Sequence, residues 1–316
     1  MEENKESEQR RRLNEKLRRE LGEIICKALD DPDVVEVMLN PDGKIWEDRH
    51  GHGMKEIGSM TLTRGLNLVG TIAGMLGTVA TELKPVVEGE LPLDGSRFEG
   101  IIPPIVEQPT FAIRKKSLKI FTFDDYVRDG VMTPEQRSII DHHIQQRHNI
   151  LVVGGTTSGK TTFCNAVLSR IAELDPDTRI AIIEDTRELQ CPAVNKFPLR
   201  TSDNVDMTQL LRACMRLRPD RIVVGEVRDK SVLALLKAWN TGHNGGVATV
   251  HANDAMSGLT RVEQLIEEGN LRPIPAVIAE AINCIVSIQR TKTGRKIQQI
   301  VVVKSGGVGG YETETY

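Results

Sequence analysis

Aromatic residues are scarce in this chain of 316 residues, at 3% of the sequence. The core must therefore be aliphatic, which favours α/β sheets lined with Val, Ile and Leu over an aromatic-rich β-sandwich. A strong excess of one charge is also missing, because the formal net charge is −3 at pH 7. Without a global basic field, we expect no direct nucleic-acid binding.

Cysteine occurs five times, at scattered positions and never in a Cys-x-x-Cys spacing. This pattern predicts reduced, mostly buried thiols and argues against a disulfide framework or a zinc site. Residues 66–80 carry no charge, but they are too few and too rich in glycine for a membrane span, so a buried or half-buried helix is expected there. The charged N-terminus lacks the pattern of a secretory signal. We therefore expect a cytoplasmic protein.

The first half of the chain has the pattern of a small α+β domain, expected over residues 1–118. Apolar residues recur every three or four positions over 6–29, which predicts an amphipathic helix. A hairpin is expected around the turn signal at 40–43, followed by a second helix over about 62–84. Apolar runs punctuated by Pro and Gly then predict a small antiparallel sheet.

The second half alternates apolar runs with helical stretches, beyond a linker predicted at 119–132. Strands that are buried on both faces and separated by helices are typical of a parallel sheet with crossover helices. We therefore expect a nucleotide-binding α/β domain over 133–304. The polar, Gly-rich tail at 305–316 is predicted to be disordered.

One loop has the spacing of a phosphate-binding P-loop, Gly-x-x-x-x-Gly-Lys-Thr, between a predicted strand and a predicted helix. Its glycines allow backbone N–H groups to converge on phosphate oxygens, and the helix N-terminus adds partial positive charge. Lys160 is expected to reach the β- and γ-phosphates, and the Thr161 hydroxyl to bind Mg²⁺. The predicted cofactors are Mg²⁺ and a nucleoside triphosphate, ATP or GTP. The nucleotide-binding residues are Gly154, Gly155, Thr156, Thr157, Ser158, Gly159, Lys160, Thr161 and Thr162.

Acidic residues at the ends of two later strands predict hydrolysis as well as binding. The apolar run 222–224 ends in Gly225-Glu226, where many P-loop enzymes carry Asp and then Glu. With glycine first, Glu226 is the expected general base for the attacking water. Glu184, Asp185 and Glu188 follow another strand, at the edge where α/β sheets bind ligands. Glu184 and Glu188 are expected to position the nucleophile and Asp185 to face the metal, although the sequence leaves open which of the three reaches it.

Two histidines lie in the segment TGHNGGVATVHANDA. His251 ends an apolar run and is expected to lie beside the acids, where it would sense the γ-phosphate. His243 comes earlier, and both a structural and a functional role remain open for it.

The ordered segments GGTTSGKTT, IEDTREL, LRPDRIVVGEVRD and TGHNGGVATVHAND resemble the Walker A, Asp box, Walker B and His box of the type II/type IV secretion traffic ATPases. In the first half, DGSRFEGIIPP and FAIRKK are similar to the family's arginine-bearing segments. The last of the four boxes and the short N-terminal domain are most similar to those of the conjugal-transfer ATPases of type IV secretion.

The resemblance implies a RecA-like P-loop ATPase domain with a mostly parallel sheet, preceded by the smaller α+β domain. It also implies a homo-oligomer, as a hexameric ring, with Arg97 and Arg114 of the N-terminal domain on the nucleotide phosphates. Arg187 and Arg228 are further candidates for such contacts. The implied partners are inner-membrane components of a secretion or conjugation channel, with the protein peripheral to the inner face of that membrane.

The leading hypothesis is a ring-forming ATPase that powers assembly or substrate transfer in type IV secretion or conjugation. A type IV pilus or type II secretion motor is an alternative. A nucleic-acid motor is disfavoured by the acidic balance and by the few aromatic rings available for base stacking. A nucleotide-gated scaffold with little turnover is also possible, although Glu226 argues against it. The transported substrate, DNA or protein, remains open.

Overall fold

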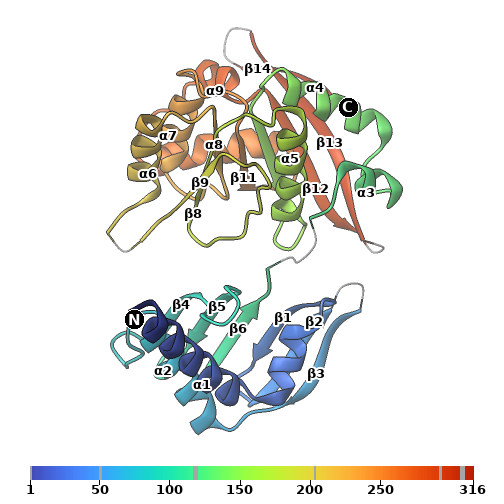
Figure 1. Cartoon of the computed structure of the whole chain (residues 1–316). Coiled ribbons are helices and arrows are strands. Elements are labelled where there is room, and N and C mark those ends of the chain that lie inside the picture. The colour runs from blue at the N-terminus through green and yellow to red at the C-terminus, as the bar shows by residue number, and fades with distance from the viewer. Residues whose placement is uncertain (1, 50–51, 117–119, 203, 292–293, 307–309) are drawn as a thin grey trace. The chain divides into compact units, whose positions relative to one another are not determined.

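The computed structural model describes residues 2–49, 52–116, 120–202, 204–291, 294–306 and 310–316. The chain divides into two compact units, Met1–Leu118 and Lys119–Tyr316, and each is described by itself (Figure 1). The elements of the N-terminal unit are α1 (Glu2–Asp30), β1 (Val34–Leu39), β2 (Lys44–Arg49), β3 (Gly53–Ser59), α2 (Leu62–Met75), β4 (Val86–Glu90), β5 (Arg97–Ile101) and β6 (Thr110–Arg114).

The N-terminal unit is an antiparallel sheet with two helices packed on it. The six strands have the order β3-β2-β1-β6-β5-β4. Side chains of a strand alternate between its two faces, and one face buries Val37, Phe98 and Ile113 against Leu21 of α1 and Ile72 of α2. The predicted α+β character and small antiparallel sheet are therefore confirmed.

The local predictions in this unit hold with two corrections. The helix expected over 6–29 is interrupted at Gly22, whose φ of 84° and ψ of 169° are not helical. β1 and β2 pair antiparallel, as expected from the turn signal, and Gly43 closes the turn with a φ of 80° while its N–H donates to Asn40 O at 2.9 Å. The helix expected over 62–84 ends at Met75. It stops there because Gly77 adopts a left-handed φ of 75°, and Thr81 then bridges to Lys84.

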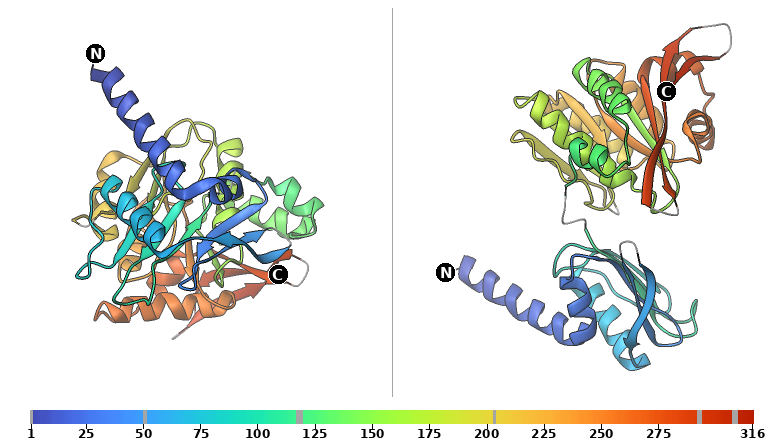
Figure 2. Two further views of the ribbon diagram at one scale, coloured as in Figure 1. Left: turned by 90° about the horizontal axis from the view of Figure 1, so that it is seen from below. Right: turned by 90° about the vertical axis from the view of Figure 1, so that its right-hand side faces the viewer.

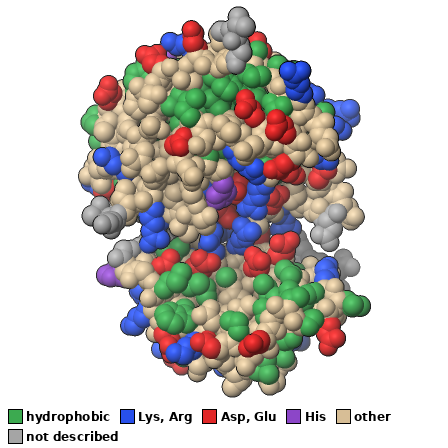
Figure 3. Space-filling view, turned by 180° about the vertical axis from the view of Figure 1, so that it is seen from behind, with side chains coloured by type: hydrophobic (Ala, Val, Ile, Leu, Met, Phe, Trp, Pro, Cys, Tyr) green, Lys and Arg blue, Asp and Glu red, His purple; other side chains and the backbone are tan. Residues whose placement is uncertain are grey.

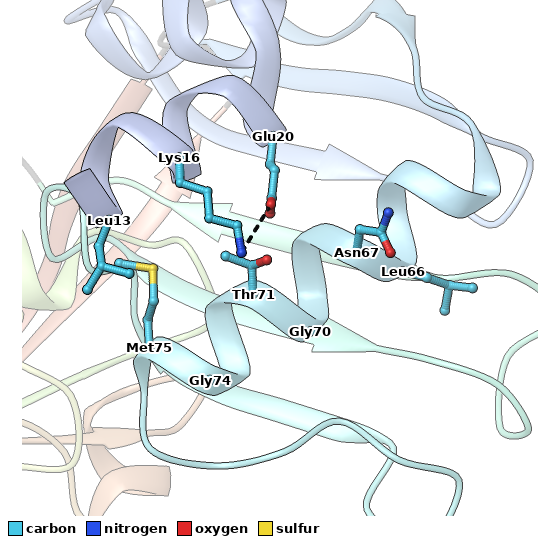
Figure 4. Close-up of a pocket in the computed structure, with 9 residues that line it drawn as sticks. All are labelled: Leu13, Lys16, Glu20, Leu66, Asn67, Gly70, Thr71, Gly74 and Met75. Carbon is cyan, nitrogen blue, oxygen red and sulfur yellow. Dashed lines mark ion pairs between the residues drawn. The ribbon is translucent and has the colours of Figure 1, made fainter.

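Helix α1 begins well outside the body of the N-terminal unit and packs against it through its second half (Figure 2). Between α1 and α2 lies an open groove, floored by Gly70 and Gly74 and flanked by Leu13 and by the Lys16–Glu20 ion pair of 3.7 Å (Figure 4). None of the predicted site residues lines this groove. It is therefore separate from the predicted chemistry.

The C-terminal unit is an α/β structure, and its sheet lies between two groups of helices (Figure 1). Its elements are α3 (Phe123–Arg128), α4 (Pro134–Gln145), β7 (Ile150–Gly154), α5 (Lys160–Leu174), β8 (Ile180–Glu184), β9 (Lys196–Arg200), α6 (Met207–Cys214), η1 (Met215–Leu217), β10 (Arg221–Val224), α7 (Ser231–Trp239), β11 (Val247–His251), α8 (Ala255–Glu268), α9 (Pro275–Ala281), β12 (Cys284–Thr291), β13 (Gly294–Ser305) and β14 (Tyr311–Thr315).

The eight strands of this unit have the order β14-β13-β12-β7-β11-β10-β8-β9. The pairs from β12 through β9 are parallel, and β13 and β14 add antiparallel strands at one edge. The predicted mostly parallel sheet with crossover helices is confirmed. One strand, β11, separates β7 from β10, so the two strands that carry the predicted phosphate and acid motifs are not direct neighbours.

Alternate side chains of the parallel strands enter two different cores. Leu151, Ile183 and Val250 face the core formed with α6 to α9. Val152 and Ile182 face the other core, formed with α3, α4 and α5. Because both faces of these strands are buried, their sequences are continuous apolar runs and do not alternate between apolar and polar residues.

Two predicted boundaries need correction. The range 119–132, expected to be a linker, contains α3, whose Phe123 ring stacks on Phe163 of α5 at 6.2 Å between centroids. The tail, expected to be disordered, forms β14 on β13 in its described part, over Tyr311–Thr315. Tyr and Thr favour strands, and the Tyr311 hydroxyl donates to Glu263 Oε1 at 2.6 Å.

The structure also tests the predictions about the cysteines and about membrane-spanning helices. All five cysteines are free thiols and four of them are buried, as expected. None of the helices in the described part of the chain combines the length and the apolarity that a bilayer crossing requires.

Candidate active site

The carboxyl ends of β7, β8, β10 and β11 lie along one edge of the C-terminal sheet because these strands run parallel. The sheet register places His251 directly beside Gly154, at the start of the predicted phosphate loop. On the face of the C-terminal unit shown in Figure 3, a histidine is flanked by basic and acidic side chains. This edge gathers the P-loop, the acidic motifs and His251 of the sequence prediction.

The P-loop has a backbone that its glycines make possible. A Cβ on Gly154 would lie 2.3 Å from Ile288 O and 2.5 Å from Ser158 Oγ, so no side chain fits there. Gly159 has a φ of 99° and Thr157 a φ of 57°, both in the left-handed region. Gly159 has no side chain to cap α5, which leaves the amides of the first turn available to an anion.

Lys160 is held at the mouth of this loop. Its ammonium donates to the carbonyls of Gly154 at 2.8 Å and Gly155 at 3.0 Å, and the side chain is only 8% exposed. Burial lowers the pKa of Lys160, against the raising effect of Glu226. A lysine that is poorly hydrated and bonded to neutral carbonyls is stabilised when an anion binds next to its ammonium.

Glu226 lies at the centre of a chain of polar contacts. Its Oε1 is 3.0 Å from His251 Nε2, and its Oε2 accepts from Arg228 Nη2 at 2.6 Å. His251 Nδ1 is in turn 3.3 Å from Lys160 Nζ. A neutral imidazole with its proton on Nε2 satisfies both contacts, because it donates to Glu226 and accepts from Lys160.

The electrostatics of this cluster favour an ionised glutamate and a neutral histidine. Burial raises the pKa of Glu226, but Arg228, His251 and Lys160 outweigh it, so the pKa lies below its ordinary value. The pKa of His251 is lowered by burial and by Lys160, with Glu226 acting in the opposite direction. Glu226 can therefore accept a proton at neutral pH, as a general base must.

The three carboxylates of the acidic loop after β8 have different surroundings, and it is Glu188, not Asp185, that lies beside Thr161. Thr161 Oγ1 donates to Glu188 Oε2 at 3.3 Å, so Glu188 is the acid beside the predicted metal ligand. Asp185 is exposed and accepts from Thr201 Oγ1 at 2.9 Å. Hydroxyl and carboxylate oxygens are the donors that Mg²⁺ prefers, and Thr161 with Glu188 supplies both.

Glu184 is buried and bonds to the backbone of its own loop. Its Oε1 accepts from the amides of Glu188 at 2.9 Å and Leu189 at 2.8 Å. A Cβ on Gly225 would lie 2.9 Å from Glu184 Cγ. The glycine that stands where many P-loop enzymes carry Asp is therefore required by the space that Glu184 fills.

Asn165 is a residue that the sequence reasoning missed. It is 1% exposed on α5, and its Oδ1 accepts from the amide of Gln190 at 2.8 Å. Together with Glu184 it fixes the path of the acidic loop. A polar residue on the buried face of the helix, five positions after Lys160, was the signal that could have identified it.

The remaining predicted residues lie elsewhere. His243 precedes β11 and is therefore at the opposite edge of the sheet from His251. Arg187 is exposed on the acidic loop. Arg97 and Arg114 face each other across β5 and β6 in the N-terminal unit, and Arg114 Nη2 is 3.4 Å from Glu36 Oε2.

Comparison with known proteins gives a consistent result. Residues 80–300 match the family described as Type II/IV secretion system protein. The chain is 51% identical to the probable conjugal transfer protein TrbB of Sinorhizobium fredii, over 96% of this chain and 94% of that protein. It is 48% identical to the conjugal transfer protein TrbB of Rhizobium radiobacter, with the same coverage.

A solved structure shows the likeness in fold. The ATPase DotB of Legionella pneumophila superposes with a TM-score of 0.60 at 17% identity, covering 86% of this chain and 77% of that one. At this identity the likeness concerns the fold alone. The family match covers most of the chain and the relatives are close, so this chain belongs to the Type II/IV secretion system protein family.

Proposed function

We propose that this protein is a P-loop ATPase of type IV secretion or conjugation, which hydrolyses ATP with Mg²⁺. The proposal rests mainly on one observation. Lys160, His251, Glu226 and Arg228 contact one another in that order, next to the P-loop. The strand order, with β11 inserted between β7 and β10, supports a RecA-like class for the C-terminal unit. The names of its relatives support the process.

In the proposed mechanism, the amides of the P-loop and Lys160 bind the phosphate chain. Thr161 and Glu188 would hold Mg²⁺, directly or through water, and a bound magnesium ion supplies charge neutralisation between the phosphates. Glu226 accepts the proton of the attacking water, because its carboxylate is ionised and is oriented by Arg228 and His251. Glu184 and Asn165 hold the loop of Glu188 through hydrogen bonds to its amides.

The proposed assembly is a homo-oligomeric ring, with a hexamer expected, that works with inner-membrane components of a secretion channel. The similarity to the conjugal transfer proteins supports this setting. The roles of Arg97 and Arg114 as nucleotide contacts stay predictions. Substituting each with Ala is expected to weaken ATP affinity, which a fluorescent-nucleotide titration would measure.

The test of the proposed function is phosphate release by the purified full chain with ATP, in Mg²⁺ and in excess EDTA. Mass photometry with a non-hydrolysable analogue would report assembly in the same samples. Magnesium-dependent turnover above an Lys160→Ala control is expected. Tight ATP binding without turnover would instead favour a nucleotide-gated scaffold.

A further inference from the structure

Three histidines lie together near the C-terminal end of α4, at the opposite edge of the sheet from the candidate active site. His142 and His143 are in the last turn of the helix, and His148 lies two residues before β7. The closest pair of rings is His143 and His148, with centroids 4.9 Å apart, while His142 lies 5.8 Å from His143 and 6.4 Å from His148. The proposed mechanism of hydrolysis uses none of the three.

The backbone at the end of α4 brings His143 and His148 together. The amide of His148 donates to His143 O at 2.9 Å and the amide of Arg147 donates to Ile144 O at 3.1 Å, while Arg147 has a left-handed φ of 54°. These two bonds form a Schellman motif, which turns the chain back over the last turn of its helix. The two positions that the motif brings into contact are commonly apolar. Here both of them carry an imidazole.

The two imidazoles meet through the same nitrogen of each ring. His143 Nδ1 and His148 Nδ1 are 2.9 Å apart, so one ring donates to the other. Burial, together with the neighbouring histidines, lowers the pKa of His143 to about 4, and burial also lowers the pKa of His148. Both rings are therefore neutral at pH 7, and a neutral imidazole with its proton on Nε2 offers the Nδ1 lone pair to a metal ion.

The separation of these nitrogens suits a particular class of metal ion. Two imidazole nitrogens that bind one ion at about 2.0–2.1 Å and at a right angle to each other are about 2.8–3.0 Å apart. The Nδ1–Nδ1 distance of 2.9 Å falls in this range, and right angles between ligands are typical of the tetragonal sites of Ni²⁺ and Cu²⁺. The negative end of the α4 dipole favours a cation here, and Arg147 in the same turn is ion-paired with Asp175 at 2.7 Å.

We propose that His143 and His148 chelate a divalent, nitrogen-preferring metal ion, Ni²⁺ or Cu²⁺, through their two Nδ1 atoms. Over the residues that the structure describes, no group of three or more His, Cys, Asp or Glu side chains is arranged to hold a metal ion. The chelate therefore has two protein ligands, and water completes the coordination from the side of His148, which is half-buried where His143 is 4% exposed.

The ion takes the place of the proton that the two rings share. The donating ring moves its proton to Nε2, and both rings tilt so that their lone pairs point at the ion. No net proton is released, because both imidazoles are neutral before and after binding. The bound ion ties the end of α4 to the segment that enters β7, so it should stabilise the C-terminal unit. This inference does not depend on the proposed function.

The experiment is a calorimetric titration of Ni²⁺ into the full chain, made without a histidine tag and with excess Mg²⁺ to compete for oxygen ligands elsewhere. His148→Leu keeps an apolar contact of the kind common in this motif and removes one ligand. It should weaken Ni²⁺ binding by at least about 10- to 100-fold, the loss typical even for partners one shell further from a metal. His143→Leu removes the other ligand, and the same result is expected. Ni²⁺ should raise the melting temperature of the wild type but not that of either variant, because a ligand stabilises only the state that binds it.

The matched control is His142→Leu, which removes an exposed imidazole from the same turn of α4. Its Ni²⁺ affinity should stay close to that of the wild type, and a loss as large as that of His148→Leu would overturn the two-nitrogen chelate. Equal Ni²⁺ binding by the wild type and His148→Leu, or no binding by either, would leave the two histidines as a hydrogen-bonded pair only. ATP titration of the same samples keeps these outcomes separate from the test of the proposed function.

Discussion

The two edges of the C-terminal sheet both carry clusters of polar and charged side chains, but the clusters are built differently. At the amino edge, Asn149 Oδ1 accepts from the amides of Gly245 at 2.8 Å and Gly246 at 2.9 Å. Arg221, 2% exposed, donates to Gly245 O at 3.1 Å and to Asp175 at 3.2 Å. Three of these four contacts end on the backbone of the Gly245–Gly246 loop, and the fourth joins Arg221 to the Asp175 carboxylate.

At the carboxyl edge, a series of side chains contact one another, from Lys160 through His251 and Glu226 to Arg228, although Lys160 and Glu184 also bond to the loop backbone. The His251 side chain is 45% exposed and that of Glu226 is 20% exposed, so water and a ligand can reach them. A backbone-bonded, buried cluster holds one geometry, whereas side chains that pair with each other can exchange partners when an anion arrives. Similar residue types therefore serve stability at one edge and chemistry at the other.

The largest effect on catalysis at the carboxyl edge is expected from Glu226→Gln. This change removes the proton acceptor while keeping the shape, so hydrolysis should slow by roughly 10²–10⁴-fold. Mg-ATP should still bind, because Lys160 and the loop amides are untouched. Single-turnover phosphate release, compared with ATP affinity, measures both effects. Glu267→Gln on the exposed surface of α8 is the control, and a normal rate per bound ATP in Glu226→Gln would make Glu226 a structural residue.

Lys160→Ala should reduce ATP affinity or turnover by about 10²–10³-fold, the scale for losing one charged donor at a phosphate site. Stability should change little, because burial already deprives the ammonium of hydration, and its bonds go only to two loop carbonyls and to His251. Calorimetric titration and the melting temperature together check this. Lys237→Ala on α7 is the matched control, and retained wild-type activity in Lys160→Ala would contradict the P-loop assignment.

Asn149→Ala should have the opposite profile. It leaves two amides of the Gly245–Gly246 turn without their acceptor, so the C-terminal unit should lose about 2–4 kcal/mol of unfolding free energy. ATP affinity of the folded protein should not change. Urea unfolding followed by Trp239 fluorescence in a Trp46→Phe background measures this loss. The control is Asn240→Ala, which removes an exposed hydrogen bond. If Asn149→Ala changed ATP affinity but not the free energy of unfolding, the amino edge would not have the purely stabilising role inferred here.

The pH dependence offers the finest test. Because the pKa of Glu226 lies below its ordinary value of 4.5, the base stays ionised as pH falls from 8 to 6. The pKa of His251 lies below 6.5, so its charge also changes little until the low end of this range. Turnover should therefore be nearly flat there. Arg228→Ala removes a group that lowers the pKa of Glu226, so the acidic limb of the rate profile should move to higher pH.

Much of the fold could be predicted because its signals are local. Buried runs such as Ile180–Glu184, the glycine pattern of the P-loop and the turn before Lys44 each depend on a few neighbouring residues. The order of motifs along parallel strands then placed the acids and His251 at one edge. These predictions needed no knowledge of distant contacts.

What escaped prediction depends on distant partners. Helix α3 has a local signal that the prediction missed, the Thr122–Asp125 capping box, but its packing depends on the distant contact of Phe123 with Phe163. Strand β14 depends on its pairing with β13 and on the contact of Tyr311 with Glu263. The bonds of Glu184 to loop amides and of Asp185 to Thr201 likewise depend on how the loop folds back. Residue type identified this acidic group, but only packing assigns each carboxylate a partner.

The close fit between Gly225 and Glu184 also restricts how this sequence can change. Any side chain at 225 meets the Cγ of Glu184, so Gly225→Asp alone is expected to damage the site. A shorter residue at 184 first opens that space, but it also releases the amides of Glu188 and Leu189. The order of substitution therefore matters: the side chain at position 184 must become shorter before position 225 can accommodate a carboxylate. The two positions are coupled, and each is tolerant to change only in the background set by the other.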